Sequence, residues 1–188
     1  MARKKRIEHH ELMAETEKLL LEKGYDTFHF RLLSERLGVG RSTIYEYYAN
    51  KDELIIAYIH TFAYERVEDC KRVMKIDDIE EKLKAYLRIF LKYSHVQQVV
   101  LILTQIEEQK NGAALTKPVK DLSKKLYTIS LELIREAKAK GYIRKDMNDI
   151  FISYVLFNLI QIPNFRQQTE EERLNEMMDF LLNGVGTE

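Results

Sequence analysis

Side chains that can donate hydrogen bonds are concentrated between Arg41 and Lys51, where five hydroxyl groups lie between the two cations. A guanidinium group can clamp a phosphate or donate two hydrogen bonds to one guanine. An ammonium group can also reach a phosphate, and hydroxyl groups bind phosphates or base edges. The residue types of this short segment therefore indicate binding to a nucleic acid, since they contain no nucleophile paired with a base.

A helix over residues 41–48 would separate these side chains onto two sides. Ile44 and Tyr48 face one side and are the predicted anchors to the core, with Arg41 and Tyr45 on its flank. The opposite side is free to enter a major groove, which is wide enough for one helix. That side consists of Ser42, Thr43, Glu46 and Tyr47.

The elements that position this segment are predicted from helical spacing, which runs through almost the whole chain, whereas strand-like alternation is nearly absent. The predicted fold class is therefore all-α, with about nine helices. Gly24 and Gly38 are expected to end the first two helices, and Pro118 is expected in the first turn of the seventh. Predicted helices cover residues 7–23, 30–37, 41–48, 51–74, 77–93, 96–109, 118–140, 148–162 and 169–183.

Two capping boxes are expected from sequence. Asn50 with Glu53 would start the fourth helix, and Thr169 with Glu172 would start the ninth. The fourth helix is predicted to be long and to join two domains without a flexible linker. Residues 1–50 are interpreted as a helix-turn-helix DNA-binding domain, and residues 51–188 as a helical ligand-binding and dimerisation domain.

Composition restricts the kind of protein further. Thirty basic and thirty acidic residues give a formal net charge of zero, so any nucleic-acid contact must use locally concentrated charge. Residues 3–6 are all basic and form either a phosphate-binding arm or a solvated terminus. Cys70 is the only cysteine, which excludes an intrachain disulfide. We expect no membrane span, no metal, no cofactor and a cytoplasmic location.

Residues 7–54 closely resemble the DNA-binding domain of TetR-family transcriptional regulators. The resemblance rests on the segments Glu22–Tyr25, Leu33–Val39, Thr43–Tyr48 and Asn50–Leu54. It departs from the family at Phe28-His29, where a threonine pair is common, and at Gly40, where a serine often stands. Ser42 and Glu46 replace a common glycine and histidine. On this resemblance and the side-chain chemistry, the expected DNA-binding residues are Arg31, Arg41, Ser42, Thr43, Tyr45, Glu46, Tyr47 and Lys51.

The resemblance implies a homodimer built from the last two helices. The alternative is a helix pair buried within one subunit. The sequence is compatible with an isologous interface, because both helices carry more apolar surface than one intramolecular contact needs. The expected interface residues are Phe151, Tyr154, Val155, Asn158, Leu174, Met177, Met178 and Leu181.

The resemblance also implies a ligand pocket inside the bundle, for an apolar or aromatic effector. The alternative is that the same aromatic residues are ordinary core. Effector binding would move the fourth helix and change the spacing of the two recognition helices, which DNA requires to be roughly 34–36 Å or a multiple of it. The candidate lining residues are Tyr58, Phe62, Tyr86, Phe90, Tyr93, Leu103, Tyr127 and Phe157.

Two other kinds of protein are alternatives to a ligand-released repressor. An enzyme is disfavoured because the sequence has no phosphate-binding glycine loop, nucleophile motif or metal-ligand motif. A helical ligand-binding or adaptor protein whose head no longer binds DNA is the alternative that Gly40 and Glu46 leave open. Repression is favoured over activation by the family alone.

Overall fold

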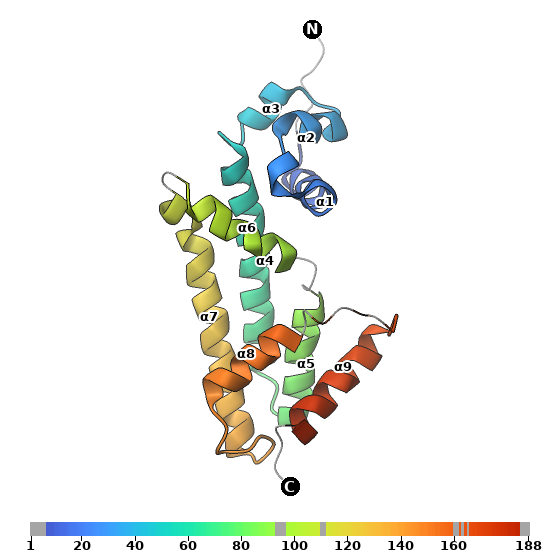
Figure 1. The fold of residues 1–188 in the computed structure, drawn as a ribbon, viewed down its shortest axis with the longest axis vertical. Helices are drawn as coiled ribbons and strands as arrows, with labels where there is room; N and C mark the ends of the chain where they lie inside the picture. Colours follow the sequence, from blue (N-terminus) through green and yellow to red (C-terminus); the bar gives the residue numbers. More distant parts are fainter. Residues whose placement is uncertain are drawn as a thin grey trace. The chain divides into compact units, whose positions relative to one another are not determined.

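The chain is all-helical throughout the part that the computed structural model describes, which is residues 7–92, 97–109, 112–159, 162, 164 and 166–184. The predicted fold class is confirmed (Figure 1). The chain forms two compact units. Unit 1 comprises Met1–Phe62 and Gln98–Lys120, and unit 2 comprises Ala63–Gln97 and Asp121–Glu188. The basic arm at residues 3–6 and Tyr93 lie outside the described residues.

Unit 1 contains the first three helices, α1 (His9–Thr27), α2 (Phe30–Leu37) and α3 (Arg41–Tyr45). The first part of α4 (Lys51–Val73), most of α6 (Gln97–Glu107) and the start of α7 (Gly112–Ala139) complete it. The apolar side of α1 is buried as its spacing predicts, and α2 packs against both α1 and α3. Burial of these apolar side chains supplies most of the free energy that holds such short helices in place.

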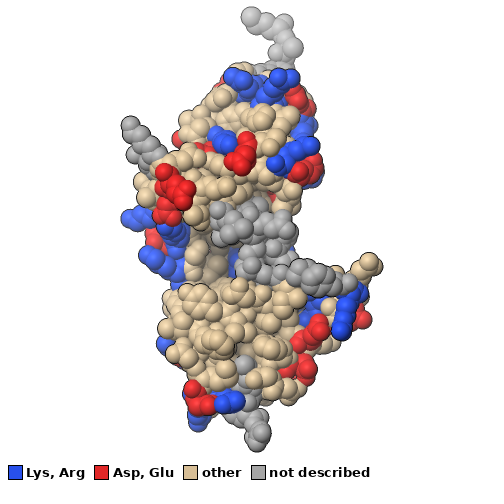
Figure 2. Space-filling model, in the orientation of Figure 1, with Lys and Arg blue, Asp and Glu red and all other residues tan. Residues whose placement is uncertain are grey.

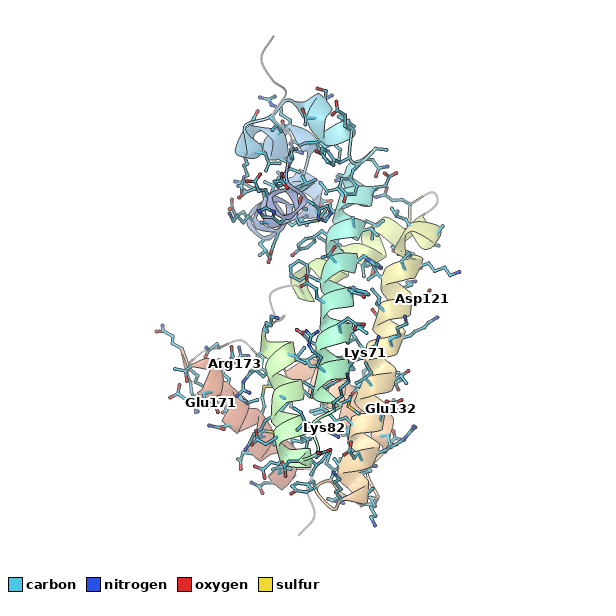
Figure 3. The ribbon with its side chains drawn as sticks, turned by 180° about the vertical axis from the view of Figure 1, so that it is seen from behind. Lys71, Lys82, Asp121, Glu132, Glu171 and Arg173 are labelled. Carbon is cyan, nitrogen blue, oxygen red and sulfur yellow. The ribbon has the colours of Figure 1, made fainter. Side chains whose placement is uncertain are left out.

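Unit 2 contains the rest of α4 and α7 together with α5 (Ile79–Lys92), α8 (Asp149–Leu159), α9 (Glu170–Asp179) and a π-helical turn at Phe180–Gly184. Polar contacts connect the apolar helices. Lys82 of α5, labelled in Figure 3, is buried, and its ammonium pairs with the Glu136 carboxylate of α7 at 2.7 Å. The Ser130 and Ser153 hydroxyls of α7 and α8 lie 3.0 Å apart. A buried charge is stable only when it is paired, so Lys82 and Glu136 specify how α5 packs on α7.

Both predicted capping boxes are present, although the first differs in detail. The Asn50 side chain accepts a hydrogen bond from the Glu53 N–H at 2.9 Å, while the Glu53 carboxylate reaches back to the N–H of Ala49. Thr169 and Glu172 form the full reciprocal pair. Each satisfies backbone donors that the first turn of a helix leaves without intrahelical partners.

Several predicted helix ends are wrong. The third helix ends at Tyr45, and residues 46–47 form a turn, so the recognition helix is shorter than expected. The seventh helix begins at Gly112, so Pro118 lies within it and not in its first turn. Proline lacks an N–H, and the carbonyl four residues earlier loses its helical hydrogen bond. The helix tolerates this loss near its start because many later turns stabilise it.

The turn between α6 and α7 depends on Gly112. A Cβ atom built on Gly112 would lie 2.8 Å from the Glu107 Cα and would overlap the Ile106 carbonyl oxygen. The Gly112 N–H also donates to the Gln109 carbonyl at 2.9 Å. The end of α6 and the start of α7 are therefore in backbone contact, which allows no side chain at this position.

We expect Gly112→Ala to reduce the free energy of unfolding by about 1–3 kcal/mol, because backbone atoms must move apart to admit the methyl group. Urea denaturation followed by circular dichroism measures the change. Gly184→Ala is the matched control, since its Cβ would meet the Phe180 ring at an ordinary 3.6 Å, and its effect should stay within about 0.5 kcal/mol. Equal stability of the two variants would contradict the close approach.

Within the described residues, no helix combines the length and the apolar character that crossing a lipid bilayer requires.

Candidate nucleic-acid interface

A glycine turn joins α2 to α3. Gly38 has φ 63° and ψ 37°, a left-handed conformation that side chains with a Cβ rarely adopt. Its N–H donates to the Glu35 carbonyl at 3.3 Å, and the Val39 N–H donates to the Ser34 carbonyl at 3.1 Å. These two bonds form a Schellman motif, which ends α2 and turns the chain sharply into α3.

The recognition helix α3 is held by its apolar side. Ile44 is fully buried, whereas Tyr48, the second predicted anchor, is only partly buried. The Tyr45 ring packs edge-on against Phe30, with ring centroids 4.9 Å apart, and the Arg41 guanidinium lies 5.6 Å from the centre of the Tyr45 ring. The Tyr45 ring therefore packs between Phe30 and the Arg41 guanidinium. These contacts restrict where the Arg41 cation can lie on the surface.

Most of the predicted DNA-binding side chains lie on the surface of this unit. All six of these residues are exposed: Arg31, Arg41, Ser42, Tyr45, Glu46 and Tyr47. Arg31 forms an ion pair with Glu35 of the same helix at 3.0 Å, whereas Arg41 makes no ion pair with any residue that the structure describes. Figure 2 shows lysine and arginine side chains over the end of unit 1 that carries α2 and α3, with acidic side chains beside them.

Thr43 requires a correction. The helical projection put it on the open side, but its side chain is only 4% exposed. Helical spacing shows on which side of α3 a residue lies, but not which neighbouring residues cover that side after folding. We therefore leave Thr43 out of the interface that we propose below.

Two further residues at this surface already have partners in the protein. The Tyr47 hydroxyl donates to the Ile7 carbonyl at 3.3 Å, which holds the residue that follows the basic arm. The Lys51 ammonium donates to the Tyr25 carbonyl at 3.0 Å and lies 3.9 Å from the centre of the Tyr25 ring. An ammonium has three donors, so Lys51 retains hydrogen-bonding capacity for a phosphate.

The candidate ligand-pocket residues fall into two groups. Tyr58, Phe62 and Leu103 belong to unit 1, where the Tyr58 and Phe62 rings are 4.8 Å apart. Unit 2 contains the others that are described. There the centroid of the Phe90 ring lies 4.7 Å from that of Tyr86 and 5.2 Å from that of Phe157. Tyr127 is partly buried. The sequence could not separate these groups, because each residue has the same helical spacing.

Two polar groups lie at the cluster formed by the rings of Tyr86, Phe90 and Phe157 in unit 2. The guanidinium of Arg66 lies 4.0 Å from the centre of the Phe90 ring. The Tyr86 hydroxyl is buried and makes no hydrogen bond of ordinary geometry with the described residues, and burial raises its pKa well above the usual range. An unsatisfied buried hydroxyl costs free energy, so this group is available to a ligand atom that enters the bundle.

The predicted dimer residues divide by helix. On α8, Phe151 and Tyr154 are 57% and 61% exposed, Asn158 is exposed and Val155 is partly buried. The space-filling view shows a broad area over α8 without lysine, arginine, aspartate or glutamate (Figure 2). The α9 residues, in contrast, are buried within the subunit, where α9 packs on α5, so their expected exposure to a partner is wrong; they are Leu174, Met177, Met178 and Leu181.

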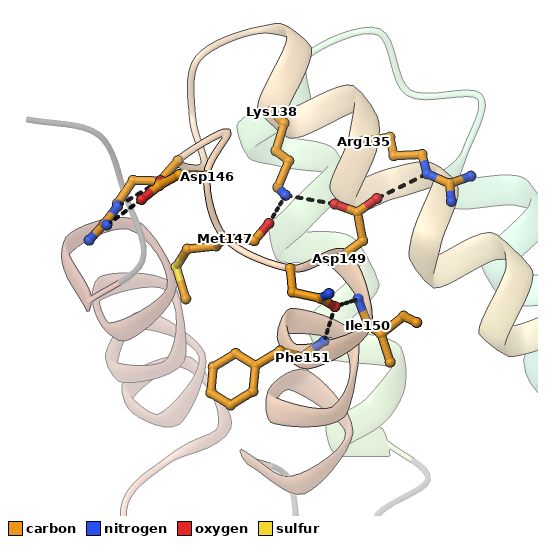
Figure 4. A network of polar contacts seen from close by, with 9 residues as sticks. Arg135, Lys138, Asp146, Met147, Asp149, Ile150 and Phe151 are labelled. Atoms are coloured by element: carbon orange, nitrogen blue, oxygen red, sulfur yellow. Dashed lines mark hydrogen bonds and ion pairs between the residues drawn. The ribbon is translucent and has the colours of Figure 1, made fainter.

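The start of α8 is fixed by polar contacts (Figure 4). The Asp149 carboxylate pairs with Lys138 at 2.6 Å and with Arg135 at 3.1 Å. The Asn148 side chain accepts hydrogen bonds from the N–H groups of Ile150 and Phe151. The ion pairs with Lys138 and Arg135 hold the pKa of the Asp149 carboxyl below its usual 3.8. The stability that these ion pairs contribute is therefore present at neutral pH and is lost only as the pH falls below 3.8. The exposed face of α8 is therefore firmly positioned.

Fold and site together define a helix-turn-helix DNA-binding protein that carries a second helical domain. Residues 12–58 match the family described as "Bacterial regulatory proteins, tetR family", and residues 63–162 match the C-terminal region of YsiA-like proteins. Since these matches cover most of the chain, the protein belongs to the TetR family of transcriptional regulators, and the predicted resemblance is confirmed.

Individual relatives agree with this assignment. The HTH-type transcriptional regulator YvaF of Bacillus subtilis is 28% identical over 181 residues, covering 93% of each chain. Among solved structures, the ketosteroid regulator KstR2 of Mycobacterium tuberculosis matches with a TM-score of 0.79 and 14% identity, over 99% of this chain and all of that one. The fatty acid regulator FadR of Bacillus subtilis, in complex with stearoyl-CoA, matches with a TM-score of 0.71 and 17% identity, over 95% of this chain and all of that one.

Two residues that sequence reasoning did not assign to the site now join it. Tyr25 contacts Lys51 and Asp52 of α4, and Gln109, in the turn that follows α6, donates to the Tyr25 hydroxyl at 2.7 Å. Tyr25 directly follows Gly24 in one of the segments that resemble the family. That resemblance identifies Tyr25 as part of the motif but does not predict its contacts with Lys51 and Gln109. No sequence signal connects it to Gln109, which is 84 residues away.

Proposed function

We propose that this regulator is a cytoplasmic homodimeric repressor that binds a two-part DNA operator through α3 and releases it when an apolar effector enters unit 2. The observation that carries the proposal is the recognition helix itself, with Ile44 buried and Arg41, Ser42 and Tyr45 offered on the surface. The contact set that we propose is Arg31, Arg41, Ser42, Tyr45, Glu46, Tyr47 and Lys51.

The roles of these residues follow from their chemistry. Arg41 reads one base pair or clamps a phosphate, and Glu46 accepts from the amino group of a cytosine. Tyr45, Tyr47 and Lys51 contact the sugar-phosphate backbone and set the register. We divide the chain functionally near residue 50, with DNA binding before it and effector binding and dimerisation after it. No catalytic step is assigned to the protein.

We propose a long-chain acyl-CoA as the first effector class to test. FadR of Bacillus subtilis, a structural neighbour, is described in complex with stearoyl-CoA. In this chain the aromatic cluster of Tyr86, Phe90 and Phe157 offers an apolar surface for an acyl chain, and the Tyr86 hydroxyl offers a donor for its carbonyl oxygen. Apolar walls with a few convergent polar groups are typical of small-molecule sites.

Selection of duplexes from a random pool, followed by fluorescence anisotropy with and without stearoyl-CoA, tests the proposal. We expect affinity to fall steeply with salt, and we expect the acyl-CoA to weaken binding about 5–150-fold. No binding to any duplex near 50 mM salt would favour the adaptor interpretation. Binding that stearoyl-CoA leaves unchanged would overturn the effector class while leaving the DNA-binding function intact.

Replacement of Arg41 by alanine should cost about 1–3 kcal/mol of operator binding and relax specificity mainly at one base pair. Lys51→Ala should instead weaken binding to all duplexes and reduce the slope of log affinity against log salt by about one. Anisotropy on operators that differ at single positions, over a range of salt concentrations, measures both. The control is Lys125→Ala, an exposed lysine of unit 2, which should change neither quantity.

Replacement of Tyr86 by phenylalanine should distinguish the effect of the hydroxyl on folding stability from its effect on ligand binding. Because the buried hydroxyl is unsatisfied, its removal should raise the free energy of unfolding by roughly 1 kcal/mol. The same change should weaken stearoyl-CoA binding about tenfold, because the donor to the carbonyl oxygen is lost. Thermal denaturation and calorimetric titration measure the two effects, with Tyr142→Phe as the control. A destabilised variant with normal ligand affinity would show that the hydroxyl is a structural group.

A further inference from the structure

Tyr25 of α1 is contacted by side chains from α4 and from the turn that follows α6, both in unit 1. Its hydroxyl donates to the Asp52 carboxylate at 2.7 Å and accepts a hydrogen bond from the Gln109 side-chain amide at 2.7 Å. Its carbonyl oxygen accepts from the Lys51 ammonium at 3.0 Å, and its ring lies 3.9 Å from the same ammonium. One residue thus contacts both the turn after α6 and the first turn of α4.

The hydroxyl of Tyr25 is fully used by this arrangement. A phenol has one proton to donate, which goes to Asp52, and its oxygen accepts from Gln109. Burial, together with the neighbouring Asp52 carboxylate, raises the pKa of Tyr25 to about 12, so the phenol stays protonated at every physiological pH. Two short hydrogen bonds in opposite directions fix the position of the ring.

The position of the ring determines where Lys51 is presented. A lysine ammonium on a flexible four-carbon chain has no preferred direction of its own. Here the ring face attracts the cation, and the adjacent carbonyl takes one of its three protons. The remaining protons are left for a phosphate oxygen, which is the contact proposed for Lys51. If the Tyr25 ring moves, the cation moves with it.

Gln109 is well placed to receive motion from α6. Its N–H donates to the Ile106 carbonyl at 3.1 Å, and its own carbonyl accepts from the Gly112 N–H at 2.9 Å. Gly112 also lies in backbone contact with the last turn of α6. We expect a displacement of α6 to carry Gln109 with it, because these backbone hydrogen bonds connect Gln109 to both α6 and α7.

We propose that Tyr25 is a positioning residue that couples α6 to the phosphate contact of Lys51, with Gln109 as the point at which the displacement of α6 reaches it. The proposal rests on the function proposed above, because it assumes that Lys51 binds DNA and that an effector releases the operator, and it adds that effector binding displaces α6. Withdrawal of Gln109 removes one of the two bonds that hold the Tyr25 hydroxyl, and the ring under Lys51 is then free to reorient.

The first experiment compares Gln109→Leu with wild type in operator binding, with and without stearoyl-CoA. Gln105→Leu is the matched control, because Gln105 is an exposed glutamine one turn earlier on α6. We expect Gln105→Leu to keep the full effector response, and we expect the response of Gln109→Leu to shrink to less than about threefold. Equal responses of the two variants would overturn the proposal.

A second experiment requires no effector. Gln109→Leu and Lys51→Ala are combined, and operator affinity is measured for both single variants and the double variant. Residues that share a partner are not additive, so the Gln109→Leu change should lose its effect once Lys51 is absent. A deviation from additivity of threefold or more is expected. Additive effects would refute the coupling, whereas absence of DNA binding in wild type would refute the proposed function instead.

Two substitutions at Tyr25 distinguish positioning from simple packing. Tyr25→Phe keeps an aromatic ring but removes both hydrogen bonds that hold the hydroxyl, so operator affinity should fall at least as far as for Gln109→Leu and the response to stearoyl-CoA should be lost. Tyr25→Leu also removes the ring, so affinity should fall and the salt slope should decrease by about one, as for Lys51→Ala. A residue with a purely structural role would change the melting temperature without changing the salt slope.

Discussion

A chain that carries Phe151→Glu and Tyr154→Glu will be monomeric in solution and will bind a two-part operator at least about 100-fold more weakly than wild type. Both side chains are exposed on α8, in an area without charged residues, and carboxylates placed there would be buried without partners in the proposed dimer. Loss of the dimer removes the gain from binding two half-sites at once, which is about 10²–10⁴-fold. Sedimentation and fluorescence anisotropy measure the two effects.

The control for this prediction is Tyr64→Glu. Tyr64 of α4 is also aromatic and is 53% exposed, close to the exposed fractions of Phe151 and Tyr154. It lies outside the proposed interface. We expect this variant to remain dimeric and to bind the operator normally. Persistence of a dimer in the α8 double variant would refute α8 as the interface. Because all three side chains are on the surface, neither protein should lose more than a small part of its folding stability.

Replacement of Ile44 by alanine is expected to reduce the free energy of unfolding by about 2–5 kcal/mol and to abolish specific operator binding. Ile44 is fully buried and is the only completely buried side chain that α3 contributes. Removal of three carbon atoms leaves a cavity that the short helix cannot fill, and a domain of ordinary stability has only about 5–15 kcal/mol in total. Urea denaturation and anisotropy on the selected operator test both parts.

The conservative variant Ile44→Val separates packing from recognition. Loss of one methylene should cost about 0.5–1.5 kcal/mol and should leave operator affinity nearly unchanged at temperatures where the head is folded. If Ile44→Ala were to bind DNA with wild-type affinity while fully folded, the buried anchor would not be what orients the recognition helix.

These two predictions concern different parts of one mechanism. Ile44 holds the recognition helix within unit 1, whereas the proposed α8 interface would hold two subunits at the spacing that a duplex requires. The coupling through Tyr25 would act between them, as a modest adjustment of a phosphate contact. Couplings of about 1–3 kcal/mol are sufficient for a repressor, because they change operator occupancy 5–150-fold.

Local sequence signals determined much of what is seen. The left-handed position of Gly38, the capping by Asn50 and Thr169, and the burial of Ile44 each depend on residues within about five positions of one another. Backbone sterics and capping chemistry act at that range, so helix order, the turn and the class of protein could be predicted from the chain alone.

Tertiary structure decided what depends on packing between distant segments. Burial of Thr43, burial of Leu174 and Met178 within the subunit, and the continuation of α7 through Pro118 all differ from what was predicted from the sequence. Each depends on which neighbour covers a given side, and periodicity contains no information about that neighbour. The contact between Tyr25 and Gln109 is the clearest case, since a hydrogen bond across 84 residues exists only after the helices have packed.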